Sequence, residues 1–309
     1  MITKPHDVAE MPSLLNLPVE LLVEVAKQAS IKDLCALRLV CRDLAAAIFE
    51  TYASTCFSVR THLSTSRGMQ MFAEVTAHEK YAKCIKNITL VAPGLDPGKY
   101  NIIALDPEST PDEYCSQMDR KYARINFEEE QSDAKRPGSI AIFLLQALNN
   151  LRIARASPSI EVCDFIPTGR PCCGLADFRD TLEMDVPSLD LSWGSCDSLY
   201  PIVLNALMAT ELVIGSLSIS ALHPMKDPPF DFPRLTSPNA GLRDLRWLKL
   251  GFGPSLEGWN FDRSDHHCHL FDASNLEHIS ISLEQWPTYS HTLYTEELLS
   301  RFAYFIEEH

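Results

Sequence analysis

The residue types with the clearest potential for chemistry stand in one short run, Asp265–His269, which reads DHHCH. All of these side chains can ligate transition metals, and zinc in particular takes nitrogen and sulfur ligands in a tetrahedron. Zinc sites usually draw paired ligands from two separate stretches, and no second Cys/His pair with finger-like spacing accompanies this run. Cys172 and Cys173 are adjacent, so on an extended strand their side chains point in opposite directions. We therefore expect a solvated loop here and no metal ion.

Patterns that position a nucleophile or a phosphate group are missing from the sequence. A nucleophile elbow reads G-x-S-x-G, and neither residues 194–196 (GSC) nor residues 253–255 (GPS) match it. No G-x-x-x-x-G-K-[ST] or G-x-G-x-x-G run occurs. None of the ten cysteines has an activating neighbour that would mark it as a nucleophile. We expect a non-catalytic protein that needs no cofactor.

The charge balance argues against two classes of partner. Lys and Arg number 27 and Asp and Glu number 41, which gives a net charge of −14. Binding to a phosphate backbone or to anionic lipid depends on clustered cations, so we expect no nucleic-acid and no membrane partner. No apolar run reaches the roughly 18 residues that span a bilayer, and Met1–Pro12 lacks the apolar stretch of a secretory signal. We expect the protein in the cytoplasm, the nucleus or both.

Three short amphipathic helices are predicted within residues 12–57. Pro18 suits the first turn of a helix, and apolar residues recur after it with helical spacing. Ser30 and Asp33 have the form of a capping box that starts the second helix, and the third is centred on Leu44. These helices carry more apolar side chains than they can hide among themselves. The surplus either forms a partner-binding surface or packs on the rest of the chain.

Two motifs in this segment resemble a known family. LPxELL at residues 17–22 and DLxxLRxVCRxL at residues 33–44 are similar to an F-box, and the resemblance covers residues 14–57. It implies that the helices bind the Skp adaptor of a cullin–RING ubiquitin ligase by apolar anchors, a form of helix-in-groove recognition. The adaptor-facing residues that it implies are Leu17, Pro18, Leu21, Leu22, Leu34, Leu37, Val40, Cys41 and Leu44.

An apolar pattern, φ-x-x-φ-x-φ, recurs beyond this segment. Its copies start at Ile85, Leu148, Val186, Ile214, Leu245 and Leu276, and the last four starts are separated by 28, 31 and 31 residues. Each copy suits a short strand with alternating side chains, and helical runs stand between several of them. This arrangement resembles a leucine-rich-repeat solenoid with irregular repeats. An ordinary α/β or α+β body with strands at these places is the alternative.

We therefore predict an α/β protein with a three-helix F-box, followed by an irregular leucine-rich-repeat-like solenoid of short parallel strands and helices. The predicted parts are the F-box at 12–57, a helical linker at 58–84 and a substrate-recognition domain at 85–309. An insertion at about 93–138 is rich in Pro, Gly and acidic residues and has little apolar periodicity, which favours a surface segment. An amphipathic helix at Thr295–His309 is predicted to cap the last repeat.

In a solenoid, the outward strand positions would line one concave face. The candidate substrate-binding residues chosen from these positions are Arg152, Asp190, Ser192, Trp247, Lys249 and His278. Trp and Arg are the residue types most often found at binding hot spots. The Trp247 ring equally fits packing against a neighbouring repeat.

The F-box resemblance, of the fungal type with a repeat-like body, predicts a substrate-recognition subunit of an SCF-type ubiquitin ligase. Its partners would be the Skp adaptor, a cullin through that adaptor, and a protein substrate of unknown identity. An F-box-containing scaffold that acts outside a ligase is the first alternative. A hydrolase whose catalytic residues are scattered along the sequence is the second, and the F-box spacing favours the other two over it.

Overall fold

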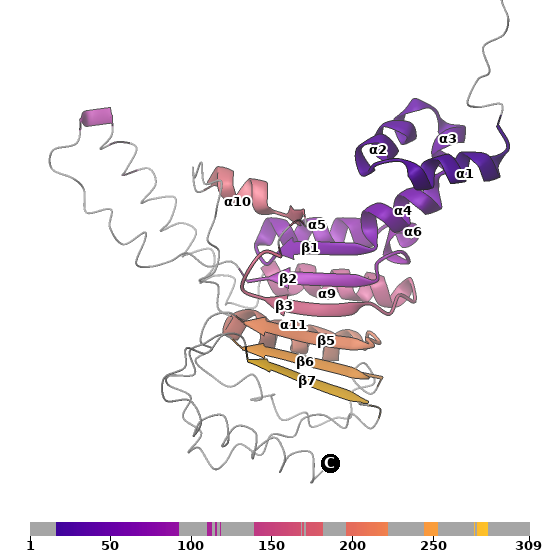
Figure 1. The fold of residues 1–309 in the computed structure, drawn as a ribbon. Coiled ribbons are helices and arrows are strands. Elements are labelled where there is room, and N and C mark those ends of the chain that lie inside the picture. The colour runs from indigo at the N-terminus through magenta and orange to yellow at the C-terminus, as the bar shows by residue number, and fades with distance from the viewer. Residues whose placement is uncertain are drawn as a thin grey trace, which may run out of the picture. The chain divides into compact units, whose positions relative to one another are not determined.

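The computed structural model describes residues 17–92, 110–112, 115, 118, 139–167, 169, 171–181, 196–221, 244–252, 275 and 277–283. The chain divides into two compact units, residues 1–58 and residues 59–309. We call the described part of the first the helical unit and the described part of the second the sheet unit (Figure 1). The predicted metal-ligand run, most of the insertion, the third copy of the apolar pattern and the closing helix lie outside the described residues.

The helical unit consists of four helices where the sequence predicted three. They are α1 (Val19–Gln28), α2 (Ile31–Val40), α3 (Arg42–Ala47) and α4 (Phe49–Phe57). The predicted third helix is interrupted at Ile48, whose backbone (φ −95°, ψ 3°) departs from helical geometry, and it becomes α3 and α4. The buried Ile48 side chain stays in the interior of the unit.

Side chains and backbone groups at the helix starts define where each helix begins. The Ser30 hydroxyl accepts a hydrogen bond from the Asp33 backbone N–H (3.2 Å) and donates to Asp33 Oδ2 (2.6 Å). The predicted cap of α2 is therefore confirmed. The Cys41 sulfur accepts from the backbone N–H of Leu44 (3.5 Å) at the start of α3. Pro18 flanks α1, and its carbonyl accepts the N–H groups of Leu21 and Leu22.

The sheet unit is built on seven parallel strands. They are β1 (Val59–Leu63), β2 (Asn87–Val91), β3 (Ser159–Cys163), β4 (Cys172–Cys173), β5 (Ser216–Ala221), β6 (Trp247–Phe252) and β7 (His278–Leu283). The strand order is β4-β1-β2-β3-β5-β6-β7, and every described pairing is parallel. Apart from β4, neighbouring strands therefore follow one another in chain order.

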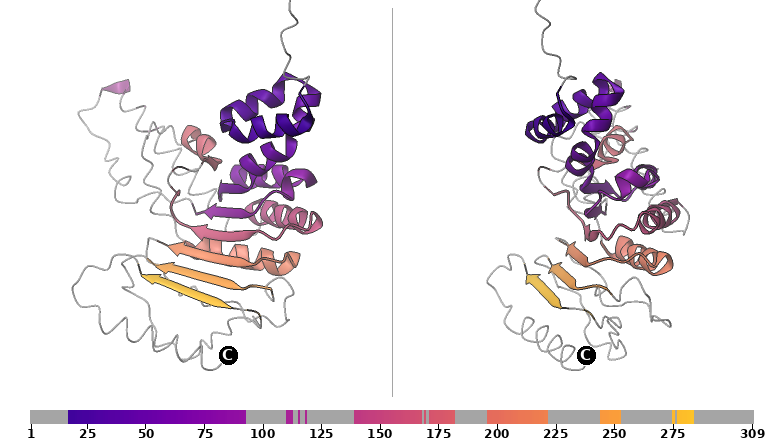
Figure 2. Two further views of the ribbon diagram at one scale, coloured as in Figure 1. Left: turned by 45° about the vertical axis from the view of Figure 1, so that its right-hand side comes forward. Right: turned by 90° about the vertical axis from the view of Figure 1, so that its right-hand side faces the viewer.

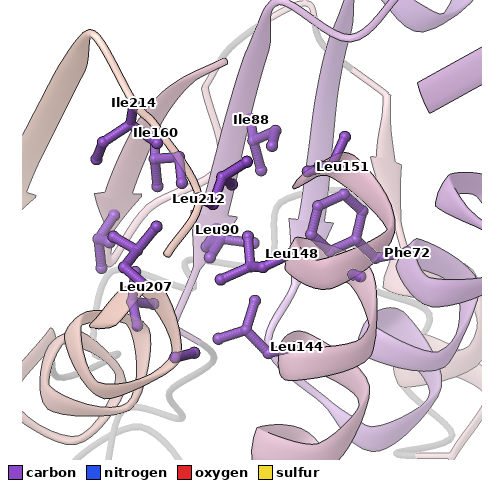
Figure 3. Close-up of a cluster of buried hydrophobic side chains, with 14 of the residues drawn as sticks. Phe72, Ile88, Leu90, Leu144, Leu148, Leu151, Ile160, Leu207, Leu212 and Ile214 are labelled. Carbon is purple, nitrogen blue, oxygen red and sulfur yellow. The ribbon is translucent and has the colours of Figure 1, made fainter. Parts of the chain in front are cut away.

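Three long helices cover one face of this sheet, and Phe178 of a fourth, shorter helix packs on Leu63, Val91 and Cys163 of the other face. The described helices of the unit are α5 (Ser66–Thr76), α6 (Glu79–Ala82), α9 (Ser139–Ile153), α10 (Leu175–Thr181) and α11 (Cys196–Thr210). Helices α5, α9 and α11 lie side by side against the sheet (Figure 2). The core between the two layers joins Phe72 of α5, Leu148 of α9 and Leu207 of α11 to strand residues such as Leu90 and Ile160 (Figure 3). Among the described residues, no helix combines the length and the apolar character needed to cross a bilayer.

Two sequence predictions for this region need correction. The segment predicted as a helical linker begins with β1, and its helix α5 contributes Met69 and Phe72 to the core. The apolar copy at Leu148 is the end of α9, because Leu144, Leu148 and Leu151 repeat with helical spacing. The strand expected there is β3 instead, which lies beyond the helix. The copies at Ile85, Ile214 and Leu245 do lead into β2, β5 and β6.

Candidate functional site

The helical unit leaves an unusual amount of apolar side chain in contact with water. Among the described residues, twelve large apolar side chains are exposed, and seven of them lie within residues 17–40. They are Leu17, Val19, Leu21, Val25, Ile31, Leu39 and Val40. Isolated exposed apolar residues are common on protein surfaces, whereas such a concentration within a short segment is typical of interaction surfaces, which makes this set the first candidate site.

The nine residues implied by the F-box resemblance divide into three groups. Leu22, Leu34 and Leu44 are buried inside the helical unit, so they hold the helices together and offer no free surface. Leu37 and Cys41 are half-buried. The exposed members are Leu17, Pro18, Leu21 and Val40, and the exposed fraction is 50% for Leu21 and 66% for Val40.

Four of the exposed apolar residues were not singled out from the sequence: Val19, Val25, Ile31 and Leu39. Leu39 is the most exposed of them, at 78%, and it occupies a position that the motif leaves unspecified. Val25 follows Leu21 by four residues, so the two lie next to each other on α1. That spacing was visible in the sequence and would have added Val25 to the candidates.

Charge contributes little to this surface. Residues 17–58 contain four cationic and five acidic side chains, close to balance. Lys27 is paired with Glu24 on the same helix (2.7 Å). The guanidinium of Arg38 lies over the Tyr52 ring, 4.6 Å from its centroid, which links α2 to α4. Apolar burial would therefore dominate any affinity of this unit for a partner.

A second candidate surface is the sheet face opposite α5, α9 and α11, which we call the polar face. The strand register aligns its residues in rows across the sheet. One row holds Val59, Asn87, Ser159, Ser216, Trp247 and His278, and the next holds Thr61, Thr89, Glu161, Ser218, Lys249 and Ser280. The two rows are two residues apart on every strand, and side chains alternate along a strand, so both rows lie on the same face of the sheet.

The polar face has an aromatic pair at β6 and β7. The rings of Trp247 and His278 stack with centroids 3.8 Å apart and planes 24° apart, and Trp247 is still 52% exposed. Lys249 is exposed on the same face, two residues further along β6. Its register neighbours, Ser218 and Ser280, carry hydroxyl groups. An aromatic surface beside a cation and hydroxyl groups can hold both apolar and anionic groups of a protein ligand.

Glu161 lies on the same face and was not among the predicted residues. Its carboxylate accepts hydrogen bonds from the Thr89 hydroxyl (3.1 Å) and, more weakly, from the Ser220 hydroxyl (3.5 Å). These contacts tie β2, β3 and β5 together on the polar face. Glu161 lies in β3, and Ser157 stands before this strand at the place where the repeating pattern requires an apolar residue, so the pattern did not reveal it.

The predicted substrate-binding residue Arg152 is not brought to this face. Arg152 lies near the end of α9, and its guanidinium donates to the Asn149 side-chain oxygen (2.9 Å) on the same helix. Arg152 was assigned to a strand because a three-residue apolar interval suits a helix as well as the start of the pattern. Asp190 and Ser192 lie outside the described residues.

Titratable groups at the β1–β4 edge are held in their neutral forms. Burial, with a smaller contribution from the Arg60 charge, lowers the pKa of His62 to about 3. Its Nδ1–H donates to the Gly68 carbonyl (3.2 Å), and its ring packs on Phe72. Burial raises the pKa of Cys172 to about 12, so its thiol stays protonated. Within the part of the chain that the structure describes, no three His, Cys, Asp or Glu side chains cluster closely enough to hold a metal ion.

Comparison with known families identifies the helical segment. Residues 14–58 match the F-box-like family, in the same place as the two motifs. No curated protein and no solved structure matches the chain. The boundary of the match coincides with the boundary of the first compact unit at residue 58. The chain thus carries an F-box-like domain at residues 14–58.

Proposed function

We propose that the chain is a substrate-recognition subunit of an SCF-type ubiquitin ligase. In this proposal the F-box-like domain binds the Skp adaptor, and through it a cullin, while the sheet unit recruits a protein substrate. The chain itself performs no chemistry: it contributes proximity, because it holds a substrate near the ubiquitin donor. The observation that carries the proposal is the set of exposed apolar side chains on α1 and α2.

The exposed apolar residues fit an adaptor interface better than they fit a free surface. Burying a Leu or Val side chain that is exposed in the free chain contributes about 1.5–3 kcal/mol. Several such side chains at helical spacing, such as Leu21 and Val25, are typical of helices that bind in an apolar groove. The near balance of charge in this segment leaves burial as the main source of affinity.

The order of strands supports a repeat-like body for substrate recruitment. Six of the seven strands are parallel neighbours in chain order, and the register positions Leu217, Leu248 and Ile279 are 31 residues apart in each step. We infer an irregular leucine-rich-repeat-like arrangement, in which stacked units present one continuous sheet face to a partner.

A pull-down of the full chain with purified Skp adaptor tests the adaptor interface. We expect wild type to bind, and we expect Leu21→Asp and Val40→Asp to weaken binding at least tenfold because each places a carboxylate in an apolar contact. Both side chains are exposed in the free chain, so neither substitution is expected to unfold it. Leu34→Asp is unsuitable, because it would put an unpaired charge into the interior of the unit.

The matched control is Ile153→Asp, the same kind of substitution at an exposed apolar residue of the sheet unit. It should bind the adaptor as wild type does. A wild-type chain that does not bind the adaptor, or Leu21→Asp and Val40→Asp variants that bind as tightly as Ile153→Asp, would exclude the proposal. Adaptor binding without cullin-dependent ubiquitination of any co-purifying protein would favour an F-box scaffold that acts outside a ligase.

A further inference from the structure

The polar face carries two charged side chains among the described residues, Glu161 and Lys249, and they differ in how far their hydrogen-bonding groups are already occupied. Glu161 is already bonded to Thr89 and Ser220, whereas Lys249 is exposed and forms no ion pair with any described residue. Lys249 and Glu161 are separated by β5, which places their backbones about 10 Å apart at a strand spacing of about 4.8 Å. At physiological salt the screening length is about 8 Å. The ammonium group of Lys249 therefore sets the local charge preference, although the whole chain is acidic.

The aromatic pair gives this surface an anchor beside the charge. Stacking on His278 fixes the Trp247 ring, yet about half of its surface faces water. The register neighbour of Trp247 on β5 is Ser216, whose side chain is small and covers little of the Trp247 ring. A half-exposed Trp that is held in place by a neighbour loses little conformational freedom when a partner packs on it.

The two groups have the spacing of an extended peptide. Trp247 and Lys249 are two residues apart on β6, which corresponds to about 6.6 Å along a strand. An extended ligand repeats its side chains on one face at the same interval. An aromatic residue at one position and a carboxylate two positions later would therefore reach Trp247 and Lys249 together. The half-buried Ser218 and the exposed Ser280, whose side chains end in hydroxyl groups, flank the carboxylate position.

We propose that the polar face at β5–β7 binds an extended acidic segment of a protein partner, with an aromatic side chain on Trp247 and a carboxylate on Lys249. This rests on the proposed function in one respect: the segment would belong to the recruited substrate. The binding chemistry itself does not depend on the adaptor.

A synthetic peptide with repeated Tyr-Ser-Glu-Ser units tests this site, because its Tyr and Glu side chains fall on one face of an extended chain. The measurement is fluorescence anisotropy of the labelled peptide with the full chain. We expect the Glu peptide to bind at least fivefold more tightly than counterparts with Gln or Lys in place of Glu. Trp247→Ala should weaken binding of the Glu peptide at least fivefold, and Lys249→Glu should reverse the preference in favour of the Lys peptide.

Lys86→Glu is the matched control, since it makes the same change of charge at an exposed lysine of the sheet unit that is not part of the polar face. It should leave the order of peptide affinities unchanged. The proposal is overturned if no peptide binds, if the Glu and Gln peptides bind equally, or if Lys249→Glu and Lys86→Glu behave alike.

The test separates this site from the adaptor interface. Trp247→Ala and Lys249→Glu should keep adaptor binding, and Leu21→Asp should keep peptide binding. Failure of the peptide test with intact adaptor binding removes only the substrate-class inference. Failure of the adaptor test with intact peptide binding removes the ligase assignment and leaves a peptide-binding sheet.

Discussion

The helical unit and the sheet unit differ in how much of their apolar side-chain surface they bury. The helical unit buries a small set of side chains, including Leu22, Leu34 and Leu44, and leaves an equal or larger set outside. The sheet unit gathers most of its buried apolar residues into a core between α5, α9, α11 and the strands (Figure 3), and a smaller cluster that includes Leu63 and Phe178 lies apart from it. The first arrangement suits a partner that is held by burial. The second suits a partner that is selected by a few specific contacts.

The contrast also shows that residue type alone does not tell whether a side chain on a helix is buried or exposed. On α2, Leu34 and Leu39 have the same chemistry, yet Leu34 is 1% exposed and Leu39 is 78% exposed. A helix of ten residues with only one fully buried side chain contributes little packing energy of its own. The helical unit is therefore expected to be the less stable of the two, and binding to a partner would stabilise it.

The largest expected effect comes from breaking the interior of the helical unit. Leu34→Ala removes a fully buried side chain and should lower the free energy of unfolding of that unit by about 2–5 kcal/mol. Leu39→Ala removes an exposed one and should change it by less than about 0.5 kcal/mol. Hydrogen–deuterium exchange of the backbone amides in α1–α4 measures both in the full chain. Similar exchange rates in the two variants would contradict the division into interior and surface.

The next effect belongs to the sheet unit and depends on pH. The folded-state pKa of His62 is lowered to about 3, while the unfolded chain has an ordinary value near 6.5. Above pH 6.5 both states are neutral at this residue, and its contribution to stability is complete. As the pH falls below 6.5 the unfolded chain binds a proton that the folded chain does not. The sheet unit should therefore lose about 1.4 kcal/mol per pH unit, or about 2 kcal/mol by pH 5.

His62→Leu is the variant that isolates this pH dependence, because the register places His62 opposite Leu90, an apolar residue on the same face. The variant lacks the titrating group, so its unfolding free energy should vary less with pH between 6.5 and 5. Denaturant unfolding at a series of pH values measures the two slopes. Equal slopes for wild type and His62→Leu would show that the buried imidazole is not the source.

The elements that the sequence predicted best are those whose apolar residues fit either the helical spacing or the strand alternation, but not both. The capping box at Ser30 and the strands β2, β5 and β6 were predicted because cap chemistry and alternation are local signals. The apolar copy at Leu148 failed because its first interval of three residues also fits a helix. Its last member, Ile153, is exposed, as expected of a residue that does not belong to the buried helical stripe.

Strand β1 was missed because it lacks the apolar alternation that predicts a strand. Its sequence, VRTHL, places Arg60 and His62 on the side that faces the core, where the pattern requires apolar residues. His62 is tolerated there because burial keeps it neutral and the Gly68 carbonyl accepts a hydrogen bond from its Nδ1–H. The candidate site shows the same limit. Glu161 is bonded to Thr89 of the neighbouring strand, and this contact depends on the order of the strands in the sheet. A single sequence does not give that order.

The smallest expected effect compares the same kind of hydrogen bond in the two units. Ser30 caps α2 in the helical unit, and Thr65 caps α5 in the sheet unit by accepting from the Gly68 N–H (3.1 Å). Replacing either by Ala removes one cap, at a cost of about 1 kcal/mol. In the helical unit this is a large share of a small stability, so Ser30→Ala should raise amide exchange along all of α2. In the sheet unit the buried Met69 and Phe72 hold the rest of α5, so Thr65→Ala should raise exchange only in the first turn. Exchange that spreads equally through both helices would mean that the two units have similar stability, and the comparison drawn between them would fail.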